Sequence, residues 1–156
     1  MAVEIERKFL VISDDWRAGG IPALYQQGYL SRDVRSVVRV RITPEQGFIT
    51  IKGLQVGIQR LEFEYAIPLP DARQLLPLCS GTIIEKHRTR VPFEGHVWEV
   101  DEFHGANTGL ILAEIELRSE DEKFTIPPWI GDEVSQDRRY HNSQLATHPY
   151  LDWQKD

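Results

Sequence analysis

Apolar and ionic residues alternate at period two along much of the chain. Near its beginning, Glu4, Glu6 and Lys8 alternate with Ile5 and Phe9. Successive side chains of a β-strand point to opposite faces, so this pattern predicts a strand with one ionic and one apolar face. Similar stretches predict eight strands, at about residues 4–10, 25–31, 36–43, 48–53, 59–67 and 82–93, after the turn at 94–96, and at 110–118.

The connections between these stretches are short, and few of them have a helical pattern. Helices are predicted as a short turn capped near Ser13, at about residues 71–78, and from Ser135 to about Leu145. The segment 127–131 is rich in proline and predicts irregular structure. Many short strands with few helices predict a mainly β (α+β) fold, an eight-stranded antiparallel sheet closed into a barrel or tunnel.

The ionic faces of these strands form an unusual set. An ordinary solvent-facing strand also alternates in this way, and for any single pair that interpretation is favoured. Here, however, the positions are almost purely ionic, and acids and bases occur in separate blocks. This favours a barrel with a charged interior, which needs a ligand to compensate buried charge. The acids are Glu4, Glu6, Glu62, Glu64, Glu99, Asp101, Glu114 and Glu116; the bases are Lys8, Arg39, Arg41, Lys52, Lys86, Arg88 and Arg90.

The two kinds of charge indicate two ligands. Carboxylates clustered without histidine or cysteine are typical of a hard divalent cation, Mg²⁺ or Mn²⁺. Clustered arginines and lysines suit phosphate oxygens, which arginine contacts with two parallel hydrogen bonds. A metal ion together with a phosphate chain explains both sets better than either ligand alone.

Composition narrows the class of protein. The 156 residues are 41% hydrophobic and 27% charged, as expected for one globular domain spanning residues 1–156. A net charge of −6 argues against a nucleic-acid partner but not against a small anionic substrate. We expect no membrane segment and no secretory signal, and the single cysteine, Cys79, fits the reducing cytoplasm.

The ordered series of motifs resembles the CYTH superfamily, the triphosphate tunnel metalloenzymes. The resemblance covers about residues 2–118, and the segment at 127–145 is similar to the short bacterial members. The motifs that carry it are Glu4-x-Glu6-x-Lys8, Arg39-x-Arg41, Thr50-Ile51-Lys52-Gly53, Glu62-x-Glu64, Lys86-x-Arg88-x-Arg90, Val100-Asp101-Glu102-Phe103 and Glu114-x-Glu116.

The resemblance implies roles for these residues. Its phosphate-binding role falls on Lys8, Arg39, Arg41, Lys52, Lys86, Arg88 and Arg90. Its metal-ligand role falls on Glu4, Glu6, Glu114 and Glu116, with Glu62 and Glu64 as further candidates and Asp101 as an acidic position that could orient a cation or a basic neighbour.

The implied activity is metal-dependent hydrolysis of a triphosphate, most simply tripolyphosphate to pyrophosphate and phosphate. The alternatives are a nucleoside or thiamine triphosphatase, then an adenylate cyclase, then a non-catalytic module that binds polyphosphate or a nucleotide. Lys8 and Tyr29, expected on neighbouring early strands, are candidates for handling the proton, and Arg41 and Lys86 are expected to be essential. Apolar outer strand faces are compatible with a homodimer.

Overall fold

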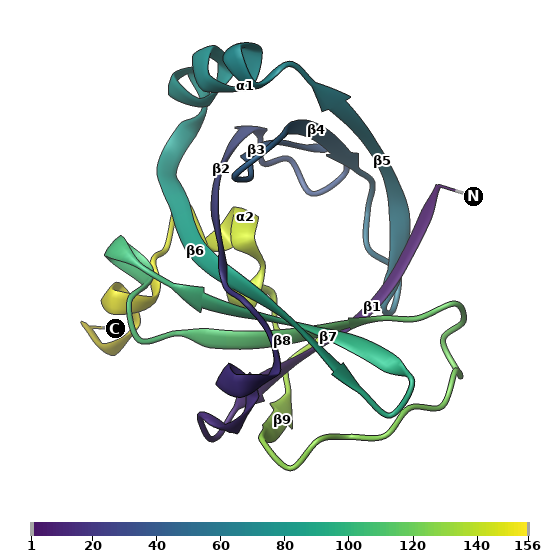
Figure 1. Ribbon diagram of the computed structural model, residues 1–156. Coiled ribbons are helices and arrows are strands. Elements are labelled where there is room, and N and C mark those ends of the chain that lie inside the picture. Colours follow the sequence, from purple (N-terminus) through teal and green to yellow (C-terminus); the bar gives the residue numbers. More distant parts are fainter. Residues whose placement is uncertain (1, 156) are drawn as a thin grey trace.

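The computed structural model describes residues 2–155 and contains a closed β-barrel (Figure 1). Met1 and Asp156, which belong to the expected domain, lie outside the described residues. The strands run antiparallel in the order β5-β4-β3-β2-β6-β7-β8-β1, and β1 pairs with β5 to close the ring. They are β1 (Val3–Val11), β2 (Ala23–Ser31), β3 (Val37–Ile42), β4 (Gly47–Lys52), β5 (Gln59–Ile67), β6 (Ser80–Phe93), β7 (His96–Phe103) and β8 (Ile111–Glu116).

The eight predicted strands and the closed antiparallel barrel are therefore confirmed. Their bounds differ from the predicted ones by one or two residues at most ends, because alternation locates a strand better than it locates the end of one. The turn at 94–96 is also where it was expected. Glu94 and Gly95 both have positive φ values, 47° and 82°, as a tight hairpin between twisted strands requires.

A ninth strand, β9 (Ile130–Glu133), corrects the prediction of irregular structure at 127–131. β9 begins after Pro127 and Pro128 and pairs with Phe9 and Val11 near the end of β1. The side chain of Arg7 on β1 forms an ion pair with Glu133, which fixes β9 on the outside of the barrel. β9 thus extends the sheet beyond the ring without entering it (Figure 1).

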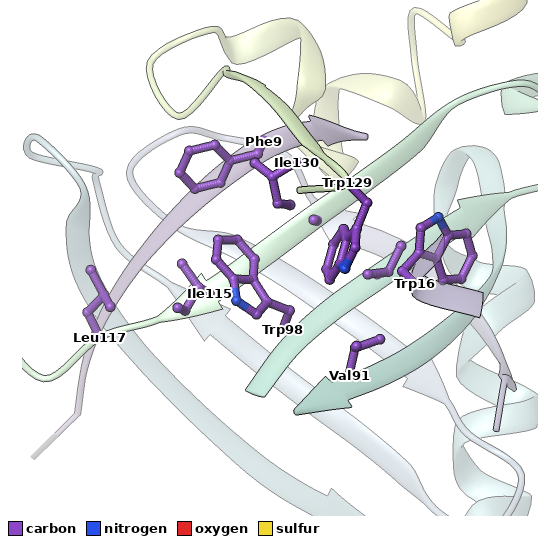
Figure 2. Packing of buried hydrophobic residues seen from close by; sticks show 10 residues of the cluster. Phe9, Trp16, Val91, Trp98, Ile115, Leu117, Trp129 and Ile130 are labelled. Carbon is purple, nitrogen blue, oxygen red and sulfur yellow. The ribbon is translucent and has the colours of Figure 1, made fainter. Parts of the chain in front are cut away.

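The main apolar core lies outside the ring. Trp98 packs edge-on against Phe9, at 5.5 Å between ring centroids, and against Trp129, at 6.0 Å. Figure 2 shows these rings with Trp16, Ile115 and neighbouring aliphatic side chains as one cluster on the outer faces of β1, β6, β7 and β8. Burial of this outer face leaves the inner face of the same strands free for ionic residues, as the alternation requires.

One of the two longer predicted helices forms, and the other is largely absent. α1 (Leu69–Leu75) continues as a 3₁₀ turn at Leu76–Leu78, close to the expected 71–78. The helix predicted from Ser135 to Leu145 is wrong: only a 3₁₀ turn at Arg138–Tyr140 and α2 (Asn142–Leu145) form there. Ser135 caps no helix, because its hydroxyl accepts a hydrogen bond from the backbone N–H of Lys8, at 2.9 Å. Within the described part of the chain, no helix is long and apolar enough to cross a bilayer.

α2 is held against the barrel by a second apolar cluster. Leu145 is fully buried and packs with Ile84, Phe103 and Leu112, which come from β6, β7 and β8. Residues 150–155 form a 3₁₀ helix whose Trp153 packs against Tyr140, at 5.0 Å between ring centroids. These contacts place residues 141–143 beside the interior of the barrel (Figure 1).

Candidate active site

The barrel interior contains a cavity of about 280 Å³ lined mostly by charged side chains. Every residue of the predicted site lines this cavity except Asp101, which is fully buried behind it. The strands that supply these residues are the ones whose ionic faces were predicted to share an interior. The alternation therefore brings the predicted set together in space.

Charge is segregated around the ring. Lys52, Arg39, Arg41 and Lys86 come from β4, β3 and β6, with only the uncharged inner face of β2 between β3 and β6. We call this side of the cavity the cationic arc; it also contains Arg88 and Arg90. The opposite side, the carboxylate arc, consists of β7, β8, β1 and β5 and contributes Glu99, Glu114, Glu116, Glu4, Glu6, Glu62 and Glu64.

Asp101 connects Lys86 and Arg88 at the rear wall. Its carboxylate accepts hydrogen bonds from Lys86 Nζ at 2.7 Å and from Arg88 Nε and Nη2 at 2.7 and 2.9 Å. Burial, together with the charges of Arg88 and Arg41, lowers the pKa of Lys86 to about 7, although Asp101 opposes this shift. The amine of Lys86 therefore changes its protonation near neutral pH.

Arg41 carries the least compensated charge of the cationic arc. Among the described residues no carboxylate lies within 4 Å of it, whereas Arg39 is paired with Glu64 at 3.3 Å. Burial and the neighbouring charges of Arg39 and Arg88 lower the pKa of Arg41 to about 9. A half-buried cation among other cations is costly, and an anion in the cavity would relieve that cost.

Carboxylates are crowded on the opposite arc. Burial, then the charges of Glu114 and Glu4, raise the pKa of Glu6 well above its usual range. The pKa of Glu4 is raised by burial and by its neighbour Glu62, with Lys52 opposing at 3.2 Å. The pKa of Glu116 is likewise raised by burial and by Glu4. These groups would be stabilised as carboxylates by additional positive charge.

The donor chemistry of this arc fits a hard divalent cation. Its ligands would be carboxylate oxygens, and one of them, Oε2 of Glu62, is buried without a hydrogen-bond partner among the described residues. Within those residues no three acidic, histidine or cysteine side chains already stand close enough to hold an ion. Metal binding would therefore require side-chain rotation, for example at Glu4 and Glu6.

The expectation that Lys8 and Tyr29 lie on neighbouring strands is wrong. β1 pairs with β5, β8 and β9, whereas β2 pairs with β3 and β6, because the chain crosses the ring after the first strand. Lys8 Nζ donates to the carbonyl oxygen of Tyr140 at 3.1 Å, and Tyr29 Oη accepts from Gln27 Nε2 at 3.1 Å. Both residues line the cavity, but on different sides of it.

Sequence analysis missed several lining residues. Arg60 was predictable, because it shares the inner face of β5 with Glu62. Tyr25 shares the inner face of β2 with Tyr29 but carries no charge, so the ionic pattern did not include it; Gln27, between them on β2, is fully buried and does not line the cavity. The lining residues Ser135, His141, Asn142 and Ser143 come from the C-terminal segment, whose sequence has no alternation to identify them.

A CYTH domain family model matches residues 2–149, nearly the whole chain. The chain belongs to the CYTH domain family. The fold, the closed ring and the resemblance expected from the motifs are thereby confirmed, and membership implies dependence on a divalent metal ion.

Similar proteins have names that agree with this membership. An inorganic triphosphatase from Acetivibrio thermocellus is 47% identical over 156 residues, covering 99% of this chain and 100% of that protein. An inorganic triphosphatase from Nitrosomonas europaea is 38% identical over 149 residues, covering 92% and 96% of the two chains. A crystal structure of an inorganic triphosphatase superposes with a TM-score of 0.65 at 35% identity, covering 91% of this chain and 96% of the other.

Proposed function

We propose that this protein is a metal-dependent triphosphatase that hydrolyses inorganic tripolyphosphate to pyrophosphate and phosphate. The observation that carries the proposal is the opposition of a cationic arc and a carboxylate arc across one cavity. The names of the relatives, both inorganic triphosphatases that match this chain over more than nine tenths of its length, support it. The substrate is therefore a triphosphate, and the ion we expect is Mg²⁺ or Mn²⁺.

The cationic arc binds the phosphate chain in this proposal. Arg41 is the first residue to bind a phosphate oxygen, because it forms no ion pair with a described carboxylate that would have to be broken. Arg39, Lys52 and Arg88 exchange part of their ion pairing for phosphate oxygens, which accept the same charge-assisted hydrogen bonds. Arg90 extends the contacts along β6, and Lys8 contributes a further cation from β1, among the carboxylates on the other side of the cavity.

The carboxylate arc holds the metal in this proposal. Glu4, Glu6 and Glu116 are the first candidates because their pKa values are raised, and Glu62 because its buried Oε2 accepts no hydrogen bond among the described residues; Glu64 and Glu114 are the next. When bound, a divalent cation offsets the charge that develops on the phosphoryl oxygens in the transition state. Asp101 we propose as a positioning residue instead, because both of its oxygens already bind Lys86 and Arg88.

The hydrolytic step needs a proton acceptor, and Lys86 is the best candidate. Water attacks the terminal phosphorus, the bridging P–O bond breaks, and pyrophosphate leaves. With a pKa of about 7, Lys86 is partly neutral near neutral pH, so its Nζ can take the proton that water loses. Tyr29, on the inner face of β2 beside β6, can hydrogen-bond the substrate or the water.

Phosphate release tests this function. The chain is incubated with tripolyphosphate, ATP or thiamine triphosphate, with Mg²⁺, Mn²⁺ or Ca²⁺ and with EDTA. We expect metal-dependent release of one phosphate per tripolyphosphate. Cyclic AMP plus pyrophosphate from ATP would instead identify a cyclase, and ligand-induced stabilisation without turnover would identify a binding module. No turnover of any triphosphate with any of the metals would refute a triphosphatase.

Three broader expectations stay proposals. The net charge of −6 supports a small anionic substrate over nucleic acid. The single cysteine, Cys79, is free, which suits the reducing cytoplasm. Leu61, Phe63 and Tyr65 are exposed on the outer face of β5, which is compatible with a homodimer.

A further inference from the structure

Gln27 is a fully buried amide at the centre of the cationic arc. Its Oε1 accepts a hydrogen bond from Arg41 Nε at 2.9 Å. Its Nε2 donates to Tyr29 Oη and to Asn142 Oδ1, both at 3.1 Å. One uncharged side chain therefore contacts two residues of the predicted site and one residue of the C-terminal segment.

The direction of each of these bonds follows from chemistry. A guanidinium only donates, so the Gln27 atom that faces Arg41 must be oxygen, and the amide nitrogen must face Tyr29 and Asn142. The hydroxyl of Tyr29 therefore accepts from Gln27, which leaves its own hydrogen for another partner. Lys86 Nζ donates to Asn142 Oδ1 at 3.0 Å, so the amide atom of Asn142 that faces Lys86 and Gln27 is its oxygen.

Asn142 thus joins Lys86 to the Gln27 group, and it reaches the cavity because the C-terminal segment is anchored there. The anchors include Lys8 Nζ on the carbonyl of Tyr140, at 3.1 Å, and the Lys8 N–H on Ser135 Oγ, at 2.9 Å. The apolar packing of Leu145 fixes the other end of α2. The segment therefore contacts β1, β2 and β6 at the site.

We propose that Gln27 and Asn142 are positioning residues that hold Arg41, Tyr29 and Lys86 in the geometry needed for hydrolysis, and that the C-terminal segment thereby forms part of the active site. This inference rests on the proposed triphosphatase function. Neither amide is charged, so each directs the catalytic groups without altering the charge of the cationic arc. Three strands and a separate segment must place these groups, and hydrogen bonds of fixed direction reduce the freedom of their long side chains.

Three substitutions in α2 test the role of Asn142. Asn142→Ala removes the acceptor for both Lys86 and Gln27, and we expect kcat for tripolyphosphate to fall by about tenfold or more while KM changes by less than about threefold. Asn142→Asp keeps an oxygen at the same place but adds a negative charge beside Lys86 Nζ, so we expect the kcat that Asn142→Ala loses to be recovered only at higher pH, where Lys86 is again neutral. Gln144→Ala, in the same helix but outside the cavity lining, is the control and should leave both constants unchanged.

The outcomes separate this inference from the proposed function. Wild type without turnover of any triphosphate refutes the function and the inference with it. Active wild type with an equally active Asn142→Ala refutes the positioning role alone, as does an equal loss in Asn142→Ala and Asn142→Asp across the whole pH range. If Asn142→Ala does not unfold cooperatively, Gln27→Met decides: it is uncharged and of similar size but loses the acceptor for Arg41 and both donors, so a lower kcat with an unchanged melting temperature supports the role, and an unchanged kcat overturns it.

Discussion

Arg41 Nε donates to Gln27 Oε1 at 2.9 Å, and this is the one hydrogen bond that the Arg41 side chain makes among the described residues. Arg41 lines the cavity, and the centroid of the Tyr25 ring lies 5.1 Å from its guanidinium carbon. The backbone of β3 and one amide thus hold a half-buried cation whose other donors make no hydrogen bond to the described residues. In the cationic arc, this arginine is the side chain most ready for an anion.

Replacement of Arg41 by alanine is expected to lower kcat/KM for tripolyphosphate by about 100-fold or more, because a charge-assisted contact in an enclosed cavity is lost. Arg41→Lys restores the charge but not the planar fork, so we expect only partial recovery. Steady-state kinetics of both variants measure the effect.

Arg35→Ala is the matched control for charge. Arg35 is 80% exposed in its side chain and lies in the loop before β3, where it pairs with Asp33. Removal of this charge should leave kcat/KM within about twofold of wild type, because exposed charges are largely screened by salt. A comparable loss in Arg35→Ala would show that net charge, and not a local contact, attracts the substrate.

Glu6 provides a test of the carboxylate arc that needs no substrate. Its pKa is raised well above 4.5 by burial and by the charges of Glu114 and Glu4. At neutral pH the folded state therefore bears the cost of either a charged Glu6 or the uptake of a proton, a cost that the unfolded state does not bear. We expect Glu6→Gln to raise the melting temperature of the metal-free protein at pH 7 and to abolish metal-dependent hydrolysis.

The effect of Glu6 on the stability of the fold changes with pH in a defined direction. A carboxyl whose pKa is higher in the folded state favours folding when protonated, and this contribution is lost as the pH rises from about 4.5 through the raised value. The stability difference between Glu6→Gln and wild type should thus be largest at neutral pH and vanish near pH 4. Melting curves from pH 4 to 8 in EDTA measure it, and a pH-independent difference would contradict the assignment.

The fold and most of the cavity lining could be predicted from the sequence, because the alternation of side chains along each strand determines both. Alternation at period two places Glu4 with Glu6 and Arg39 with Arg41 on one face, whichever strands are neighbours. Closure of the ring then collects every such face in the same interior. The separation of acids from bases around the ring also follows, because each strand carries mostly one sign of charge.

Alternation does not specify which strands pair or how deep a side chain lies. Lys8 and Tyr29 were placed on neighbouring strands by their closeness in sequence, whereas pairing is set by crossings of the ring. Asp101 has the parity of a lining residue but lies behind Lys86 and Arg88. Asn142 reaches the site from a four-residue helix that is placed by tertiary packing and has too few residues for a periodic signal.

The apolar cluster outside the ring offers a prediction about stability. Trp98 is fully buried against Phe9 and Trp129, so Trp98→Ala should destabilise the protein by about 3–5 kcal/mol through the cavity it leaves. Its Nε1 has no hydrogen-bond partner among the described residues, so Trp98→Phe loses no polar contact and should cost less. Leu78→Ala, at a position 69% exposed, is the control and should change stability little. Urea unfolding monitored by far-UV circular dichroism measures all three.

Tyr25 bears on the choice between inorganic and nucleoside triphosphates. Its ring lies 5.1 Å from the guanidinium carbon of Arg41 and 5.2 Å from that of Arg88, which come from the strands on either side of β2. Two cations therefore lie over the ring of Tyr25, and a purine would have to displace one of them to stack on this ring. We expect kcat/KM for tripolyphosphate to exceed that for ATP by at least about tenfold.

Tyr25→Phe should keep this preference, since the ring remains, whereas Tyr25→Leu should raise KM for tripolyphosphate, because the guanidiniums of Arg41 and Arg88 lose the ring that both contact. A Tyr25→Leu enzyme with unchanged constants for both substrates would show that the ring has no part in the choice.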